Sequence, residues 1–226
     1  KSEKVALRSG FIVMGYRYEY TKIIRSKKYI QQYIPFKSAA YCLASLFDAS
    51  FHLLDKAFQL SRLKKYRWQV SDSFEEHTNE FWQTLPENFE LIGTRNQGYM
   101  NWRFKESPYC HNNFFSLFEN NTFIGCIAFT TANSRCQIVD LTYGGNRQHL
   151  RTMLCLFTQY QRSIGSEALT ITICGHDLFL ETIKKLGFSI RNKENKVIYY
   201  SNRKNLNLSG SHKKHVWYLT DADNYI

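Results

Sequence analysis

One carboxylate interrupts an otherwise apolar stretch of the sequence. Asp140 stands between the Ile138–Val139 pair and Leu141, in a segment with the pattern of a strand. Apolar surroundings favour the protonated form of a carboxylate, so such a group can accept a proton during catalysis. The alternation of a strand equally allows Asp140 to face solvent or a basic partner such as Arg103. Asp140 is therefore the first candidate for a general base.

A histidine is the second residue with useful acid–base chemistry. His176 directly precedes a short helical pattern. The ordinary pKa of imidazole, about 6.5, suits proton transfer at neutral pH. A histidine in this position also commonly caps the helix or faces solvent. His176 is the candidate catalytic acid.

Two consecutive glycines precede a longer helical pattern. Gly144 and Gly145 are followed by Asn146 and Arg147. Glycines at a helix start let its free N–H groups and positive dipole end approach a phosphate, and Arg147 adds a cation. The same residues fit a plain strand-to-helix turn with Asn146 as the N-cap. An anion-binding turn and a structural turn both remain open.

Hydrophobic periodicity predicts the elements that carry these residues. Alternation predicts strands over 11–24, 114–118, 123–130, 136–142, 169–174, 188–200 and 216–219. Apolar residues at three- and four-residue steps, with glycine stops, predict helices over 1–9, 35–62, 74–85, 147–164 and 177–186. The segment 95–108 fits a helix or an extended arm. This order of strands, a crossover helix and further strands predicts an α+β or mixed α/β fold.

A long helix divides the predicted elements into three parts. Residues 36–68 form an amphipathic connecting helix, and we expect the main domain over 69–226. Leu7–Phe11 and Ile183–Phe188 both combine a helix end, a glycine and an aromatic residue that begins a strand. This echo predicts that residues 1–35 are the tail of an earlier repeat, although common helix-capping chemistry explains it equally well.

The composition limits the classes of partner and location. The net charge is +11, but Lys and Arg occur as scattered pairs, which does not favour a nucleic-acid groove. The 6 cysteines include no C-x-x-C pair, and four of them lie in apolar strand or helix patterns, which predicts reduced core thiols, a cytoplasmic location and no metal site. No apolar run approaches the roughly 20 residues of a membrane-spanning helix, and no signal-peptide pattern opens the chain.

Several short motifs resemble those of one enzyme superfamily. Arg95, the run Gly-Tyr-Met-Asn-Trp-Arg-Phe at 98–104 and Pro-Tyr at 108–109 are similar to an arginine, Tyr-Leu-x-Trp-Arg-Phe and Pro-x-x-Tyr pattern. The closing run Trp217–Asp223 and the element Leu186–Phe188 fit the same family. It is the GNAT (general N-acetyltransferase) superfamily, in a branch found in bacterial polysaccharide gene neighbourhoods. The resemblance implies a GNAT-like central mixed sheet flanked by helices. Because members are often tandem repeats, it also implies a further GNAT repeat on the N-terminal side as a partner.

The resemblance implies where a donor and an acceptor would bind. In GNAT enzymes the pantetheine arm of acyl-CoA lies between two splayed strands, which match 137–142 and 169–174 here. The implied donor contacts are Leu141, Thr142, Tyr143, Gly144, Gly145 and Arg147. The implied acceptor contacts are Trp102, Arg103, Asp221 and Asp223. The chain departs from the usual phosphate signature of the family, and Ile183 stands where many members carry a tyrosine acid.

Three functions follow from these observations. The leading hypothesis is an N- or O-acyltransferase that uses acetyl-CoA or another acyl-CoA and acts on a small amine or an activated sugar. The first alternative is a Fem-type aminoacyl transferase with aminoacyl-tRNA as donor, which the positive charge fits. The second is a degenerate, non-catalytic GNAT repeat that serves as a scaffold, which the departures from the family motifs fit.

Overall fold

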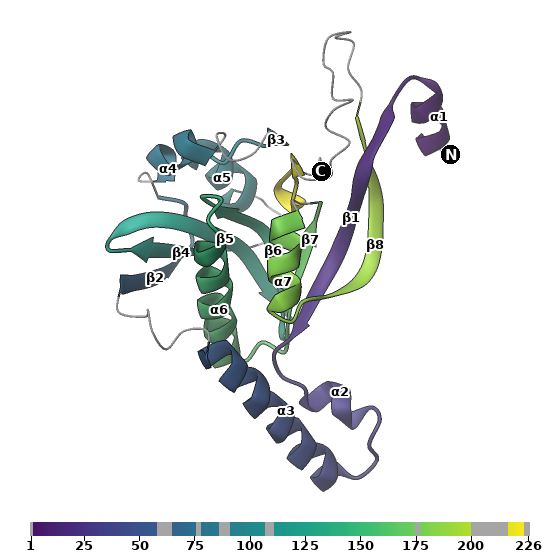
Figure 1. Ribbon diagram of the computed structural model, residues 1–226, viewed down its shortest axis with the longest axis vertical. Coiled ribbons are helices and arrows are strands. Elements are labelled where there is room, and N and C mark those ends of the chain that lie inside the picture. Colours follow the sequence, from purple (N-terminus) through teal and green to yellow (C-terminus); the bar gives the residue numbers. More distant parts are fainter. Residues whose placement is uncertain are drawn as a thin grey trace.

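A seven-stranded mixed sheet forms the centre of the protein (Figure 1). The computed structural model describes residues 2–57, 65–75, 78–85, 91–106, 111–174, 177–199 and 217–223. In spatial order the strands are β2 (Tyr66–Ser71), β4 (Asn113–Glu119), β5 (Thr122–Ala132), β6 (Arg135–Tyr143), β7 (Ala168–Ile173), β1 (Ile12–Ile23) and β8 (Ser189–Tyr199). All neighbours are antiparallel except β6 and β7, which are parallel.

The helices of the described residues are α1 (Ser2–Arg8), α2 (Lys27–Gln31), α3 (Lys37–Ala57), α4 (Thr78–Thr84), α5 (Gln97–Met100), α6 (Arg147–Ser163) and α7 (Asp177–Lys185). A π-helical turn, Asn101–Lys105, continues α5, and a 3-10 turn spans Asp221–Asp223. In Figure 1, α6 and α7 lie across one face of the sheet, and α3 projects away from it.

Alternation along β4 separates two hydrophobic cores. Phe115 points to the face covered by α6, where its ring lies 5.3 Å from that of Phe157. Phe114 points to the opposite face and joins a second core with Met100 and Phe104 from α5 and the π-helical turn. Successive side chains of a strand point to opposite faces. The sheet is therefore covered on both faces at β4 and β5.

The N-terminal strand lies inside the sheet. β1 pairs with β7 along one edge and with β8 along the other. Tyr20 on β1 is 1% exposed and belongs to the core beneath α6 and α7. The structure shows that β1, the strand of this region, completes the sheet. The hypothesis that residues 1–35 are the tail of an earlier repeat stays a prediction.

The elements expected from periodicity correspond to observed ones, and three further ones were not predicted: the helix α2 and the strands β2 and β3 (Leu91–Ile92). The expected boundary between residues 68 and 69 falls inside β2. The closing strand expected over 216–219 is β9 (Trp217–Tyr218), which pairs in parallel with β3 (Leu91–Ile92) in a separate two-stranded sheet. Residues 1, 58–64, 76–77, 107–108, 200 and 216 of the expected elements lie outside the described residues.

Helix α3 shows the expected amphipathic pattern but buries little of it. Among its described side chains only Ala40 and Ala44 are buried. Leu46 and Phe47 are 68% and 51% exposed. In the described part of the chain, no helix is both long enough and apolar enough to cross a membrane.

Candidate functional site

The parallel strands β6 and β7 separate part-way along their length. They are paired at four positions, from Arg135 with Ala168 to Ile138 with Ile171. Beyond this point β6 continues to Tyr143 without β7 as its partner. Backbone N–H and C=O groups on the two facing edges must therefore find other partners or bind a ligand.

A β-bulge lies at the same place on the other edge of β6. Ala128 and Phe129 of β5 pair with Asp140 and Ile138, so Val139 is the extra residue. A bulge leaves its extra residue out of the ladder and redirects the side chains that follow. The strand therefore changes direction where it parts from β7, and Asp140 follows the bulge directly.

The opening between the strands is bridged by residues 217–223, here called the 217–223 segment. Leu219 exchanges two backbone hydrogen bonds with Cys174, the residue after β7, with N···O distances of 2.9 and 3.0 Å. The Tyr218 hydroxyl donates to the Leu141 carbonyl oxygen on β6. Tyr218 is 1% exposed, and its ring lies 5.6 Å from that of Phe179 on α7. The segment thus bonds to β6 on one side and to the end of β7 on the other.

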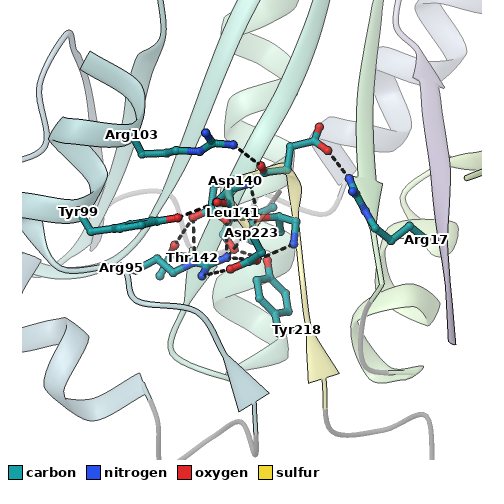
Figure 2. Close-up of polar contacts among 12 residues, drawn as sticks. Arg17, Arg95, Tyr99, Arg103, Asp140, Leu141, Thr142, Tyr218 and Asp223 are labelled. Carbon is teal, nitrogen blue, oxygen red and sulfur yellow. Dashed lines mark hydrogen bonds and ion pairs between the residues drawn. The ribbon is translucent and has the colours of Figure 1, made fainter. Parts of the chain in front are cut away.

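A buried arginine anchors the segment to β6 (Figure 2). Arg95 donates to the Asp140 carboxylate at 3.1 and 3.3 Å and to the Asp223 carboxylate at 2.6 and 2.8 Å. Asp140 also accepts from Thr220 at 2.5 Å and Thr142 at 3.0 Å. The side chains of Arg95 and Asp140 are 0% exposed. Each buried charge therefore has charged and hydrogen-bonding partners, as burial requires.

The electrostatics of this cluster follow from its burial. Burial alone lowers the pKa of Arg95, but the charges and hydrogen bonds of Asp140 and Asp223 raise it above its ordinary value. Burial, followed by the charge of Asp140, raises the pKa of Tyr218 well above its ordinary value. At neutral pH, Arg95 is therefore a cation and Tyr218 is a neutral hydrogen-bond donor.

Gly93 leaves space for the side chains of Arg95 and Asp223. A Cβ atom on Gly93 would lie 2.0 Å from Asp223 Oδ1 and 2.5 Å from Arg95 Nη1. The backbone at residue 93 thus passes directly beside the ion pair. Any larger residue at this position would displace one of the two side chains.

A second carboxylate of the segment lies nearer to solvent. The Asp221 side chain is 25% exposed; it forms an ion pair with Arg17 of β1 and accepts from Gln137 of β6 at 3.1 Å. Arg103 donates to the Asp221 main-chain oxygen at 3.2 Å, and Tyr99 donates to that of Ala222. Figure 2 shows Arg17 reaching the segment from one side and Arg95, Tyr99 and Arg103 from the other.

The structure brings several of the predicted site residues together. Asp140, Thr142, Arg103, Asp221 and Asp223 all belong to this contact network. The basic partner of Asp140 is Arg95, not Arg103. Trp102 lies at the margin, 59% exposed, with its ring 5.8 Å from that of Tyr99. His176 lies outside the described residues.

The glycine turn before α6 lies beside α4, since a Cβ atom on Gly144 would lie 3.4 Å from the Phe81 ring. Gly145 has a φ of 77°, and the Asn146 side chain accepts from the Gln148 N–H as an N-cap. Arg147 pairs with Glu181 on α7 at 3.6 Å, and both side chains are well exposed. Tyr143 is 3% exposed, with its ring 6.2 Å from that of Tyr218.

A separate cavity lies elsewhere on the molecule. It measures about 730 Å³ and lies between α4 and the β4–β5 hairpin, lined in part by Arg67, Phe81 and Phe118. It shares no lining residue with the network around Arg95. The candidate site is therefore defined by the strand opening and not by this cavity.

Six residues of the site had no role predicted from the sequence. They are Arg17, Arg95, Tyr99, Gln137, Tyr218 and Thr220. Arg17 and Gln137 occupy polar positions of alternating strands, which resemble any solvent-facing positions. The signal that the sequence did carry was the Thr-Asp-Ala-Asp run at 220–223 near Tyr218.

Two solved structures share this arrangement of strands and helices. A functionally unknown conserved protein from Staphylococcus epidermidis aligns with a TM-score of 0.50 and 10% identity, over 84% of this chain and 62% of that one. A conserved protein from Enterococcus faecalis, described as a probable N-acyltransferase, aligns with a TM-score of 0.50 and 11% identity, over 86% of this chain and 42% of that one. The chain has a GNAT-like fold.

The likeness is limited to the fold. FemX aligns at a TM-score of 0.47 and 10% identity, over 89% of this chain and 69% of that one. No protein-family model and no curated protein matches the sequence. The chain spans less than two thirds of the length of the two structures above.

Proposed function

We propose that the protein is an acyltransferase that moves an acyl group from acyl-CoA to the nitrogen or oxygen of a small amine or an activated sugar. The observation that supports this is the opening between β6 and β7 beyond Ile138 and Ile171. An extended donor with amide groups can pair with the free strand edges, as an added strand would. The GNAT-like fold makes such a donor the natural first choice.

The backbone of β6 is suited to the chemistry of acyl transfer. The acceptor atom attacks the thioester carbonyl carbon and forms a bond to it. The carbon–sulfur bond breaks, the sulfur leaves with its electron pair as the CoA thiolate, and the acceptor proton passes to water. We propose that the N–H of Val139, which the bulge leaves out of the ladder, binds the carbonyl oxygen as negative charge develops on it. Leu141, Thr142 and Tyr143 would then line the donor arm.

We propose that the phosphates of the donor lie at the start of α6. Gly144 and Gly145 lead into the helix, whose first N–H groups and positive dipole end favour an anion. Arg147 adds a cation that its exposed pairing with Glu181 leaves accessible to solvent. The side chains of Trp102 and Arg103 lie on the other side of β6, where we place the acceptor.

Asp140 has a different role in this proposal from that expected of a general base. Its carboxylate accepts from Arg95, Thr142 and Thr220 and is fully buried. A carboxylate held in this way positions other groups and has no access to solvent for releasing a proton. We propose that Asp140 orients Arg95 and the 217–223 segment.

Calorimetric titration tests the proposal directly. We expect acetyl-CoA to bind the protein, and pantetheine, which lacks the nucleotide phosphates, to bind more weakly. Arg147→Ala should weaken binding of acetyl-CoA and leave that of pantetheine unchanged. Absence of heat with acetyl-CoA at millimolar concentration, together with tRNA that co-purifies with the protein, would instead favour aminoacyl transfer.

One observation favours a second candidate, a non-catalytic scaffold. The 217–223 segment already occupies the strand opening, and its anchoring residues Tyr218 and Thr220 are 1% exposed. If the segment never leaves, the opening serves the fold and not a ligand. The scaffold would be supported if no acyl donor binds. It would also require that Arg147→Ala changes no property of the protein except its charge.

A further inference from the structure

The 217–223 segment makes the contacts that a donor in the strand opening would need. Its Leu219 pairs with the free edge after β7 through two backbone hydrogen bonds, and its Tyr218 hydroxyl satisfies the Leu141 carbonyl of β6. These are the facing strand edges left open where β6 and β7 part. The segment and an amide-bearing donor therefore compete for the same backbone groups.

The charges of the segment resemble those of an anionic ligand. The contacts around it join three guanidinium groups and three carboxylates, from Arg17, Arg95, Arg103, Asp140, Asp221 and Asp223. Two of the carboxylates, Asp221 and Asp223, belong to the segment. Withdrawal of the segment would remove two carboxylates from beside these guanidinium groups, which makes the surface more attractive to anions.

The deepest charges of the site do not depend on the segment. Arg95 and Asp140 contact each other through two hydrogen bonds and lie on the body of the domain, before α5 and on β6. If the segment leaves, each keeps a charged partner, so the large penalty of an isolated buried charge is avoided. Strand β9 is only two residues long and lies outside the seven-stranded sheet.

From these observations we propose that the 217–223 segment is a built-in gate: it occupies the donor site as an internal anionic ligand, and the acyl donor binds only when the segment withdraws. The proposal rests on the proposed acyltransferase function. In the closed state the segment excludes other anions from the site. The donor shifts the equilibrium because its amide groups pair with the strand edges that the segment releases, while its phosphates bind at the start of α6.

A disulfide can lock this gate with a thiol that the chain already has. Cys174 is a free cysteine, and its partner Leu219 exchanges both backbone hydrogen bonds with it. Residues paired in this way have Cα atoms about 5.5 Å apart, within the range of disulfides. In oxidised Leu219→Cys, acetyl-CoA should bind at least about tenfold more weakly than in the reduced form. Dithiothreitol should restore binding.

A matched control distinguishes the effect of the disulfide from the effect of the Leu219→Cys substitution itself. Leu219→Cys combined with Cys174→Ser cannot form the disulfide, so its affinity for acetyl-CoA should not respond to oxidant or reductant. Equal affinity of the oxidised and reduced forms of Leu219→Cys would overturn the gate while leaving the acyltransferase proposal intact.

Hydrogen exchange tests the gate without any donor. In the wild-type protein, the Leu219 amide should exchange much faster than the amides of the β5–β6 ladder, since opening of the segment exposes it. Gly93→Ala, whose methyl group would press on Asp223 and Arg95, should accelerate this exchange further. A Leu219 amide as protected as the β5–β6 ladder would refute the gate. Fast exchange without acetyl-CoA binding in any form would refute only the proposed donor.

Discussion

At the scale of single residues, the candidate base is part of a buried ion cluster. Asp140 lies opposite Arg95, and two threonine hydroxyls complete its hydrogen bonds. Removing one partner of a buried pair costs far more than removing an exposed charge, because the other charge loses its compensation. The cluster should therefore be visible in the stability of the protein.

Asp140→Ala tests this role. Arg95 would keep Asp223 but lose its fully buried partner, and we expect the free energy of unfolding to fall by about 3 kcal/mol. Urea denaturation measures the change. Asp72→Ala, at an exposed carboxylate, should change stability by less than about 0.5 kcal/mol. Equal effects of the two substitutions would contradict the role, as would loss of transfer with unchanged stability.

Buried Tyr143 should make the stability of the protein fall at alkaline pH. Burial raises the pKa of Tyr143 to about 12, against about 10 in the unfolded chain. Between these two pKa values Tyr143 is ionised in the unfolded chain and still neutral in the folded protein. The contribution of neutral Tyr143 to stability is therefore fully present below pH of about 10 and is lost as the pH rises towards 12. Tyr143→Phe should therefore flatten the fall of stability above pH of about 10. Urea titrations at several pH values measure it, with Tyr33→Phe as the exposed control. An unchanged slope would contradict it.

The residues of the site were only partly predictable. Asp140 was identifiable because a charge in an apolar strand is conspicuous, and Asp221 and Asp223 because they belong to a short motif. The partner of Asp140 was not identifiable, since Arg95 lies 45 residues away and Arg103 is an equally suitable basic residue. Long-range pairing of charges depends on tertiary contacts that no local pattern encodes.

At the scale of elements, local patterns predicted most of the helices and strands, but not the short helix α2. Strand β2 was missed, although Tyr66, Trp68 and Val70 alternate with polar residues, because an edge strand carries a weak apolar signal. The place of β1 in the sheet was also not predictable. It pairs with β7 and β8, which follow it by more than 140 residues, and periodicity says nothing about such pairing.

Tyr20→Ala tests whether β1 is an integral part of the sheet. Tyr20 is 1% exposed within the main core, so we expect a loss of about 3 kcal/mol in the free energy of unfolding. Val5→Ala, at a residue of α1 that is 62% exposed, should have little effect. Thermal denaturation of both variants measures the difference. A Tyr20→Ala protein as stable as the wild type would show that β1 is an accessory strand.

At the scale of the whole molecule, a GNAT-like sheet opens between two strands, and the chain itself fills the opening. The sheet, the bulge at Val139 and the start of α6 provide the parts that a donor would need. The 217–223 segment supplies the contacts that keep these parts occupied. Donor binding and segment release are therefore expected to be coupled, since both use the same strand edges.

Hydrogen exchange with and without acetyl-CoA tests this coupling most directly. We predict that saturating acetyl-CoA slows exchange of the amides at 139–143, where the donor pairs with β6, and accelerates exchange of the Leu219 amide as the segment leaves. Unchanged exchange at both places in the presence of millimolar acetyl-CoA would contradict the account.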